Sequence, residues 1–231
     1  ISGTENLENS VGEVVLIAKN EIGYKNLLVL TSELSVNSNF DKFISYANLK
    51  GYKDGIILLT GGIENGFVGK PASLGDIKLV NDRLKILKDL FRDNLYIELQ
   101  RHGIKSQVNA EKILLDFSHK FNLPLVATND CFFENENKFN AHRVLTCIDK
   151  GLTISSNNRR LLTKEHYIKD TNKMISLFED IPEAIENTVI IAQRCSFFAK
   201  THEPILPKFP GLKNVCETEF LSDVSKKGLM K

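Results

Sequence analysis

The chain has 231 residues, of which 42% are hydrophobic and 26% charged, a balance that is typical of globular domains and excludes disordered or fibrous chains. Its 30 Lys and Arg residues nearly cancel its 29 Asp and Glu residues, so the net charge is +1. A surface that grips nucleic acid over its whole extent needs a surplus of positive charge, and only a local basic patch is compatible with this composition.

The first twelve residues are polar and without period, which predicts a loose terminus or a loop. Glu5 and Glu8 stand where the basic region of a secretion signal would lie, so we expect no signal peptide. No apolar run reaches the roughly 18 residues of a membrane helix. The four cysteines form no Cys-x-x-Cys pair, which indicates cytosolic thiols. We therefore expect a cytoplasmic protein with no membrane contact.

Four short apolar runs predict buried strands, at residues 14–18, 55–59, 95–99 and 123–128. Amphipathic segments with helical spacing of apolar side chains separate these runs, at residues 24–34, 40–49, 77–91 and 108–121. This alternation predicts an α/β fold in which parallel strands are joined by right-handed crossovers.

The last hundred residues contain helical patterns but no such strands. Helices are predicted at residues 140–148, 172–178 and 182–197, with Asp180 as a capping residue and Pro182 in the first turn of the last one. Three prolines then interrupt the chain, and we expect a domain boundary near residues 208–211 and a new helix at 217–229. Because four strands are too few for a barrel of about eight units, the sequence is interpreted as part of a longer polypeptide.

The polar ends of the predicted strands are the places where parallel α/β folds bind ligands. Asp130 follows the fourth strand and is a candidate metal ligand or general base. The alternative is that Asp130 caps a turn or a helix. The glycine-rich segment 60–70 lacks the spacing of a phosphate-binding loop and predicts a plain turn.

The five histidines show no metal-ligand spacing such as His-x-His. His119 is expected to face solvent, and His142 is expected to be a structural histidine. Arg101 and His102 predict a charged loop that faces a partner or a phosphate. Cys131 is expected to be a small buried side chain and not a nucleophile.

Several segments together resemble the polymerase and histidinol phosphatase (PHP) domain at the amino end of bacterial DNA polymerase III alpha subunits. The resemblance runs from about residue 14 to the chain end. The most specific segments are Asn-Glu-x-Gly-Tyr-x-Asn-Leu at residues 20–27 and Pro-Leu-Val-Ala-Thr-Asn-Asp at 124–130. Further matching segments stand in the same order at residues 56–62, 96–103, 177–188 and 206–210.

The resemblance implies a partial, distorted (β/α)7 barrel that lacks its first strands, followed by the start of a polymerase palm. Residues 1–210 would form the PHP domain, without its amino-terminal units, and residues 211–231 the beginning of the palm. The palm's catalytic aspartates lie further on in this family, so we expect no catalytic residue in this segment. Alone it would not extend DNA.

Three departures from the metal-binding members of the family affect the expected site. Glu13 stands where those members have His, Gly62 where they have Cys, and Phe132 where they have the His of an Asp-x-His motif. Asp130 remains as a lone ligand. Losing soft N and S ligands predicts a metal-free domain in which a residual zinc or manganese site is not expected, whereas the full-length polymerase would use magnesium.

The implied role is a stabilising scaffold that docks the proofreading exonuclease subunit. The full-length protein would be a DNA-directed DNA polymerase that binds DNA through other domains and contacts other holoenzyme subunits, including the sliding clamp. An alternative is an active metal-dependent phosphoesterase, a 3′–5′ exonuclease or pyrophosphatase, with Asp130 and Glu13 as ligands. A stand-alone small-molecule phosphatase is a third possibility. Arg101, His102 and residues 158–160 are candidate partner contacts.

Overall fold

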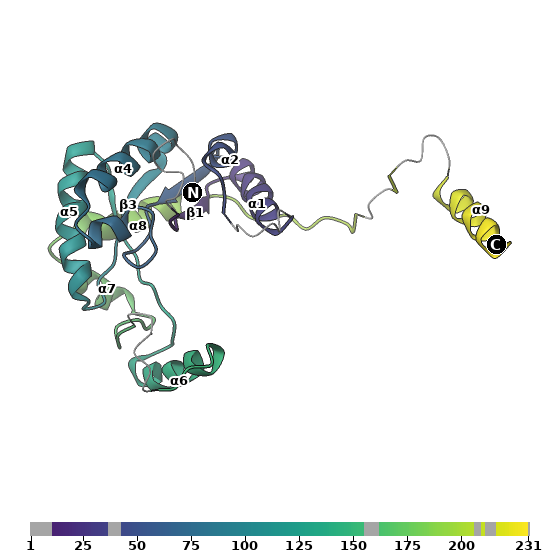
Figure 1. The fold of residues 1–231 in the computed structure, drawn as a ribbon. Helices are drawn as coiled ribbons and strands as arrows, with labels where there is room; N and C mark the ends of the chain where they lie inside the picture. The colour runs from purple at the N-terminus through teal and green to yellow at the C-terminus, as the bar shows by residue number, and fades with distance from the viewer. Residues whose placement is uncertain (1–10, 37–42, 155–161, 206–208, 211–215, 231) are drawn as a thin grey trace. The chain divides into compact units, whose positions relative to one another are not determined.

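The computed structural model describes residues 11–36, 43–154, 162–205, 209–210 and 216–230 (Figure 1). The chain divides into two compact units, Ile1–Phe198 and Ala199–Lys231. The first unit is an α/β structure built on a four-stranded mixed sheet.

The elements of the first unit are, in chain order, β1 (Val15–Ala18), α1 (Glu21–Val36), α2 (Tyr46–Gly51), β2 (Ile56–Leu59), α3 (Gly69–Ser73), α4 (Ile77–Phe91), the short 3-10 helix η1 (Arg92–Asn94), β3 (Leu95–Leu99), α5 (Lys105–Phe121), β4 (Leu125–Ala127), the 3-10 helix η2 (Glu136–Lys138), α6 (Phe139–Asp149), α7 (Thr171–Leu177) and α8 (Pro182–Arg194).

The strands lie in the order β1-β2-β3-β4, and β2, β3 and β4 run parallel. β1 runs antiparallel to β2, with Ala18 opposite Ile56. The prediction that all four strands are parallel is therefore wrong for β1. Two helices separate β1 from β2, so β2 begins beside the carboxyl end of β1. There the Lys19 N–H donates to the Gly55 carbonyl oxygen (2.8 Å). In the described residues the sheet is open, and barrel closure is not observed.

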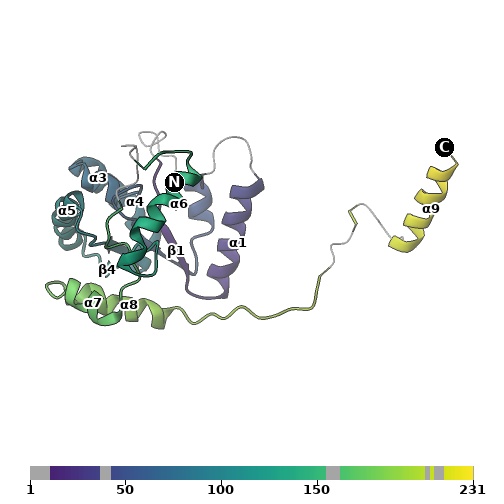
Figure 2. The ribbon, with the colours of Figure 1, turned by 90° about the horizontal axis from the view of Figure 1, so that it is seen from below.

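Apolar side chains fill both faces of the sheet because successive strand residues alternate between them. Ile56 and Leu58 belong to the larger core, to which α4 contributes Val80, Leu84 and Leu87. Ile57 and Leu59 face the other way, where they share a smaller cluster with Tyr96, Val126 and Ile191 of α8. Figure 2 shows α7 and α8 together along the side of β4.

The predicted strands and most predicted helices are present, with shifted ends. α3 was missed, since the glycines and the proline around it indicated only a turn. Gly69 needs to be glycine because a Cβ there would lie 2.4 Å from the Gly62 carbonyl oxygen. α8 does begin with a proline, but its N-cap is Ile181 and not Asp180, which is bound elsewhere.

The second unit contains α9 (Glu217–Leu229), which matches the predicted helix. The Phe209 ring lies 5.5 Å from that of Phe220, and the Phe209 N–H donates to Glu217 Oε1 (2.8 Å). That a palm domain begins at residue 211 stays a prediction. Among the helices of the described residues, none combines the length and hydrophobicity that crossing a bilayer requires.

Candidate functional site

A pocket of about 700 Å³ opens at the carboxyl ends of β2, β3 and β4, the edge at which the sequence predicted a site. Gly62 follows β2 and lines the pocket without a side chain, whereas polar side chains come from Gln100 after β3 and from Thr128, Asn129 and Asp130 after β4. Glu13, which precedes β1, and His166 line it as well.

Glu13 and Asp130, the two carboxylates named by the alternative hypothesis, line this one pocket. Glu13 is fixed by its backbone, which pairs with the turn at Asn65 and Gly66. Its Oε1 accepts a hydrogen bond from Asn65 Nδ2 (3.3 Å). Asp130 is half-buried at the end of β4, as the strand-end argument predicted.

Glu98, within β3, is the most deeply placed acid of the pocket and was missed by the sequence analysis. Its carboxylate accepts hydrogen bonds from the Gly61 N–H (3.1 Å), Thr128 Oγ1 (2.5 Å) and Gln100 Nε2 (3.1 Å). Burial raises the pKa of Glu98, and the nearby Asp130 charge raises it further, while these hydrogen bonds oppose the shift. An acidic residue inside an otherwise apolar strand was the sequence signal that could have revealed it.

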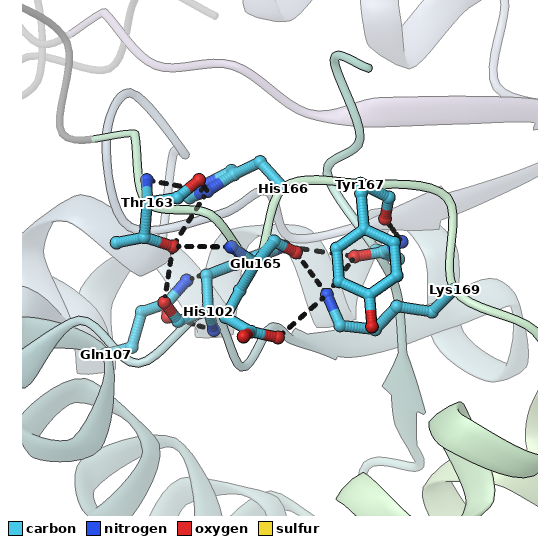
Figure 3. A network of polar contacts seen from close by, with 8 residues as sticks. His102, Gln107, Thr163, Glu165, His166, Tyr167 and Lys169 are labelled. Carbon is cyan, nitrogen blue, oxygen red and sulfur yellow. Dashed lines mark hydrogen bonds and ion pairs between the residues drawn. The ribbon is translucent and has the colours of Figure 1, made fainter. Parts of the chain in front are cut away.

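His102 lies behind the pocket and is fully buried, in a hydrogen-bond network whose donors and acceptors can be assigned (Figure 3). The Gln107 amide oxygen accepts from the His102 N–H (2.7 Å), so its amide nitrogen donates to His102 Nδ1 (2.9 Å). The proton therefore sits on Nε2, which donates to Asn129 Oδ1 (3.2 Å). Burial lowers the pKa of His102 to about 4, helped by the charges of His166 and Lys169, and the imidazole is neutral.

The segment 163–169 returns to the sheet and packs on this histidine (Figure 3). The His166 ring stacks on His102 with ring centroids 4.0 Å apart. Thr163 Oγ1 donates to the His102 carbonyl oxygen (2.7 Å), and the Thr163 N–H donates to His166 Nδ1 (3.1 Å). Lys169 Nζ donates to Asn129 Oδ1 (3.4 Å) and to the Glu165 carbonyl oxygen. The network joins the ends of β3 and β4 to this return segment.

The prediction that Arg101 and His102 form an exposed charged loop is wrong. Arg101 donates from Nε and Nη2 to the Glu111 carboxylate (2.9 and 2.6 Å) and from Nη1 and Nη2 to that of Asp180 (2.6 and 2.9 Å). Its guanidinium also lies 4.7 Å from the centroid of the Phe178 ring. The fifth N–H of the guanidinium, on Nη1, donates to the Leu177 carbonyl oxygen (2.7 Å), so no donor is left for a partner.

Other residue predictions have mixed outcomes. His119 is exposed as predicted, and His142 packs on Phe132 and Phe133 as a structural histidine. Cys131 is exposed, so the prediction of a buried thiol is wrong; it lies just before Phe132, whose N–H donates to the His166 carbonyl oxygen (2.9 Å). Residues 158–160 lie outside the described residues.

The donor set of the pocket does not fit a transition-metal cluster. A Cβ at Gly62 would meet Gln100 Oε1 at 2.4 Å, so a ligand side chain at position 62 would require the flexible Gln100 side chain to move. Phe132, which offers no ligand atom, places its ring 6.1 Å from that of His166. Within the described ranges, no three His, Cys, Asp or Glu side chains converge on one point. Glu13 and Asp130 remain as hard oxygen donors.

Residues 3–102 match the family model described as PHP domain, so the chain carries a PHP domain. Curated proteins named DNA polymerase III subunit alpha are similar over most of the chain: 37% identical over 218 residues in Caulobacter vibrioides, 37% over 221 in Rickettsia bellii and 35% over 219 in Pasteurella multocida.

Each of these alignments covers 94% of this chain, which spans only about 19% of the length of these curated relatives. The chain thus carries a PHP domain and is similar, over nearly its whole length, to one part of DNA polymerase III alpha subunits.

Proposed function

We propose that this chain acts within a DNA polymerase III alpha subunit as a metal-free PHP scaffold that docks the proofreading exonuclease subunit. The observation that carries the proposal is the residue set at the strand ends, where Gly62 has no side chain and Phe132 offers no ligand atom. A scaffold needs a rigid body, and the polar groups of the pocket are largely engaged with one another: Glu98 alone accepts three hydrogen bonds.

The whole protein is proposed to be a cytoplasmic, DNA-directed DNA polymerase that uses magnesium at its palm, binds DNA through other domains, and contacts the sliding clamp and other holoenzyme subunits. The polymerase assignment is supported by the relatives, which are named DNA polymerase III subunit alpha. The four strands are proposed to be part of a distorted seven-stranded barrel, and α9 to be the opening helix of the palm.

Metal content tests the scaffold. The alpha subunit is exposed to zinc and manganese, dialysed, and measured by elemental mass spectrometry. We expect near-zero metal at the PHP domain. The matched control is the triple variant Glu13→His, Gly62→Cys, Phe132→His, which reinstates the ligand types that the family resemblance implies; metal in this variant alone shows that the assay detects a PHP site. Two or more tightly bound ions in the unmodified protein would overturn the metal-free role.

Binding of the exonuclease subunit tests the docking role separately. The 231-residue chain and the full alpha subunit are titrated with the exonuclease subunit of the same organism in a calorimeter. We expect both to bind. Binding by the full subunit but not by this chain would place the docking surface elsewhere and contradict the proposal.

A second candidate function is a metal-dependent phosphoesterase, favoured by Glu13 and Asp130 lining one pocket. Two carboxylates can hold a hard cation such as manganese or magnesium. If this function is present, Asp130→Asn abolishes hydrolysis of a DNA 3′ end or of pyrophosphate while the melting temperature stays unchanged. An unchanged rate in Asp130→Asn would exclude it.

A further inference from the structure

α6 carries a row of aliphatic side chains on the face that the described chain leaves uncovered. Ala141, Val144, Leu145 and Ile148, here called the α6 stripe, follow the i, i+3, i+4, i+7 spacing of one helix face. Leu145 is 64% exposed and Ile148 72% exposed. Isolated exposed aliphatic residues are ordinary, but a continuous row on one helix marks an interaction surface.

The opposite face of α6 is already used for packing within the chain. The Phe139 ring lies 5.9 Å from the Phe133 ring, and the His142 ring lies 5.6 Å from it. Cys147 is buried on the same side. α6 is therefore apolar on two faces, and the fold of the first unit accounts for only one of them. Figure 1 shows α6 standing apart from α4, α5 and the sheet.

The base from which α6 projects is firmly held. The Phe132 N–H donates to the His166 carbonyl oxygen (2.9 Å), and the Ile168 N–H to that of Phe133 (3.1 Å). Asn129 Nδ2 donates to the Tyr167 carbonyl oxygen (2.8 Å), next to the stacked histidine pair. These bonds tie the segment that leaves β4 to the segment that returns. The segment from which α6 projects is thus hydrogen-bonded to the return segment beside the buried His102.

The chemistry of the stripe favours a permanent cover over a transient partner. All four of its side chains are aliphatic, whereas transient interfaces have about the polarity of ordinary surface. Permanent interfaces are more apolar and resemble a divided domain core. The relatives are much longer than this chain, which matches about 19% of their length, so a polypeptide of their kind offers a large surface outside the matched part.

We propose that the α6 stripe packs against an apolar surface of the same alpha-subunit polypeptide, outside the part that this chain represents. The proposal rests on the proposed function in one respect, that this chain acts within an alpha subunit. It requires neither an empty metal site nor binding of the exonuclease.

Side-chain footprinting tests the cover directly. Hydroxyl radicals oxidise exposed Leu and Ile side chains, and mass spectrometry of the α6 peptide reports the rate at Leu145 and Ile148. We expect oxidation to be severalfold slower in the full alpha subunit than in the 231-residue chain. Equal rates in the two proteins would overturn the proposal. If oxidation of the 231-residue chain alone became slower as its concentration rose, a second copy of the chain would be the cover, and the proposal would also be overturned.

A pair of variants separates a covered stripe from a merely exposed one. Leu145→Asp with Ile148→Asp should lower the melting temperature of the full alpha subunit and leave that of the 231-residue chain unchanged. Asn140→Asp is the control for added negative charge, since it adds one such charge at an exposed position of α6 beside the stripe, and it should affect neither protein. Unchanged melting of the full subunit would contradict the cover.

The exonuclease subunit is added to the footprinting in a final arm. Protection that appears only in its presence would overturn the intramolecular cover and identify the exonuclease as the occupant. If the α6 stripe is protected in the full alpha subunit without the exonuclease, and the exonuclease does not bind in the calorimeter, the intramolecular cover is supported and the docking role is refuted. The two proposals therefore fail by different results.

Discussion

His102 is kept neutral by its surroundings, which weakens the folded state in acid. Its pKa is about 4 in the folded protein and about 6.5 when unfolded, so the unfolded state binds the extra proton first as pH falls. The stabilising contribution is complete above pH 6.5 and is lost between pH 6.5 and 4. From this shift, we expect His102 to account for about 2–3 kcal/mol of the stability lost between pH 7 and pH 4.5.

The variant His102→Gln tests this contribution, because Gln can both accept from Gln107 and donate to Asn129 but cannot be protonated. Urea unfolding at pH 7 and pH 4.5 should show a smaller acid loss in this variant than in the unmodified chain. His119→Gln, which removes an exposed histidine of α5, should keep the full acid loss. Equal losses in all three proteins would contradict the assignment.

Glu98 should act in the opposite sense. Because burial raises its pKa, the folded state holds the proton to higher pH than the unfolded state does, and stability falls as pH rises from about 4.3 through the folded pKa. Glu98→Gln keeps the shape of the side chain and should reduce this loss of stability between pH 5 and pH 8.

Glu98→Ala leaves the donors of Gly61, Thr128 and Gln100 without an acceptor. It should lower the free energy of unfolding by about 2–4 kcal/mol at pH 7. Urea titrations of both variants measure the two effects; a Glu98→Ala variant as stable as the unmodified chain would contradict the hydrogen-bonding role.

These residues also show which parts of the site the sequence could predict. Asp130 was found because it is polar and directly follows an apolar strand. Glu98 was missed because its partners, Gly61 and Thr128, come from two other strand ends, and strand pairing alone brings them together. Arg101 was misplaced for the same reason, since Asp180 is 79 positions away. The pattern of neighbouring residues in the sequence indicates burial and capping, whereas the partners of an ion pair depend on the tertiary fold.

At the scale of elements, Arg101 joins three parts of the chain. From the end of β3 it binds Glu111 of α5 and Asp180 ahead of α8, and it donates to the Leu177 carbonyl oxygen at the end of α7 (2.7 Å). The Glu111 side chain is 18% exposed and that of Asp180 is 65% exposed, so the first pair is better shielded from water. The planar fork of Arg serves both carboxylates at once, which a Lys ammonium cannot do.

We expect Arg101→Lys to lower the free energy of unfolding by about 1–3 kcal/mol. Glu111→Gln should cost more than Asp180→Asn, because exposed pairs contribute about 0–1 kcal/mol. A double-mutant cycle of Arg101→Lys with each carboxylate variant, followed by urea unfolding, measures the two couplings. A larger coupling to Asp180 than to Glu111 would contradict this ranking.

The strand directions show a second limit of sequence patterns. The existence and positions of the four strands followed from short apolar runs, and their order matches the chain order. The antiparallel direction of β1 did not follow, because it depends on whether the two helices before β2 act as one crossover or as an outward and a returning helix. The structure has an outward and a returning helix. Gly23, in the first turn of α1, closely approaches Gly55, just before β2, since a Cβ at residue 23 would lie 1.9 Å from the Gly55 carbonyl oxygen.

At the scale of the whole molecule, the two compact units should be separable. The folded body of the first unit ends with the hydrogen bond from the Ser196 N–H to the Lys19 carbonyl oxygen (3.3 Å). Residues 199–205 have no regular secondary structure and are exposed, and no side chain of α9 is buried. A 13-residue helix that buries no side chain is only marginally stable in water.

We therefore expect limited trypsin digestion to cut first in the exposed segment, at Lys200, and to leave the first unit intact. A chain truncated after Phe198 should melt at the same temperature as the 231-residue chain, because the first unit contains its own apolar core. A peptide of residues 216–230 should show little helix by circular dichroism in water and more in trifluoroethanol. A clear drop in melting temperature on truncation would mean that the second unit stabilises the first, and the two units would then have to be treated as one cooperative domain.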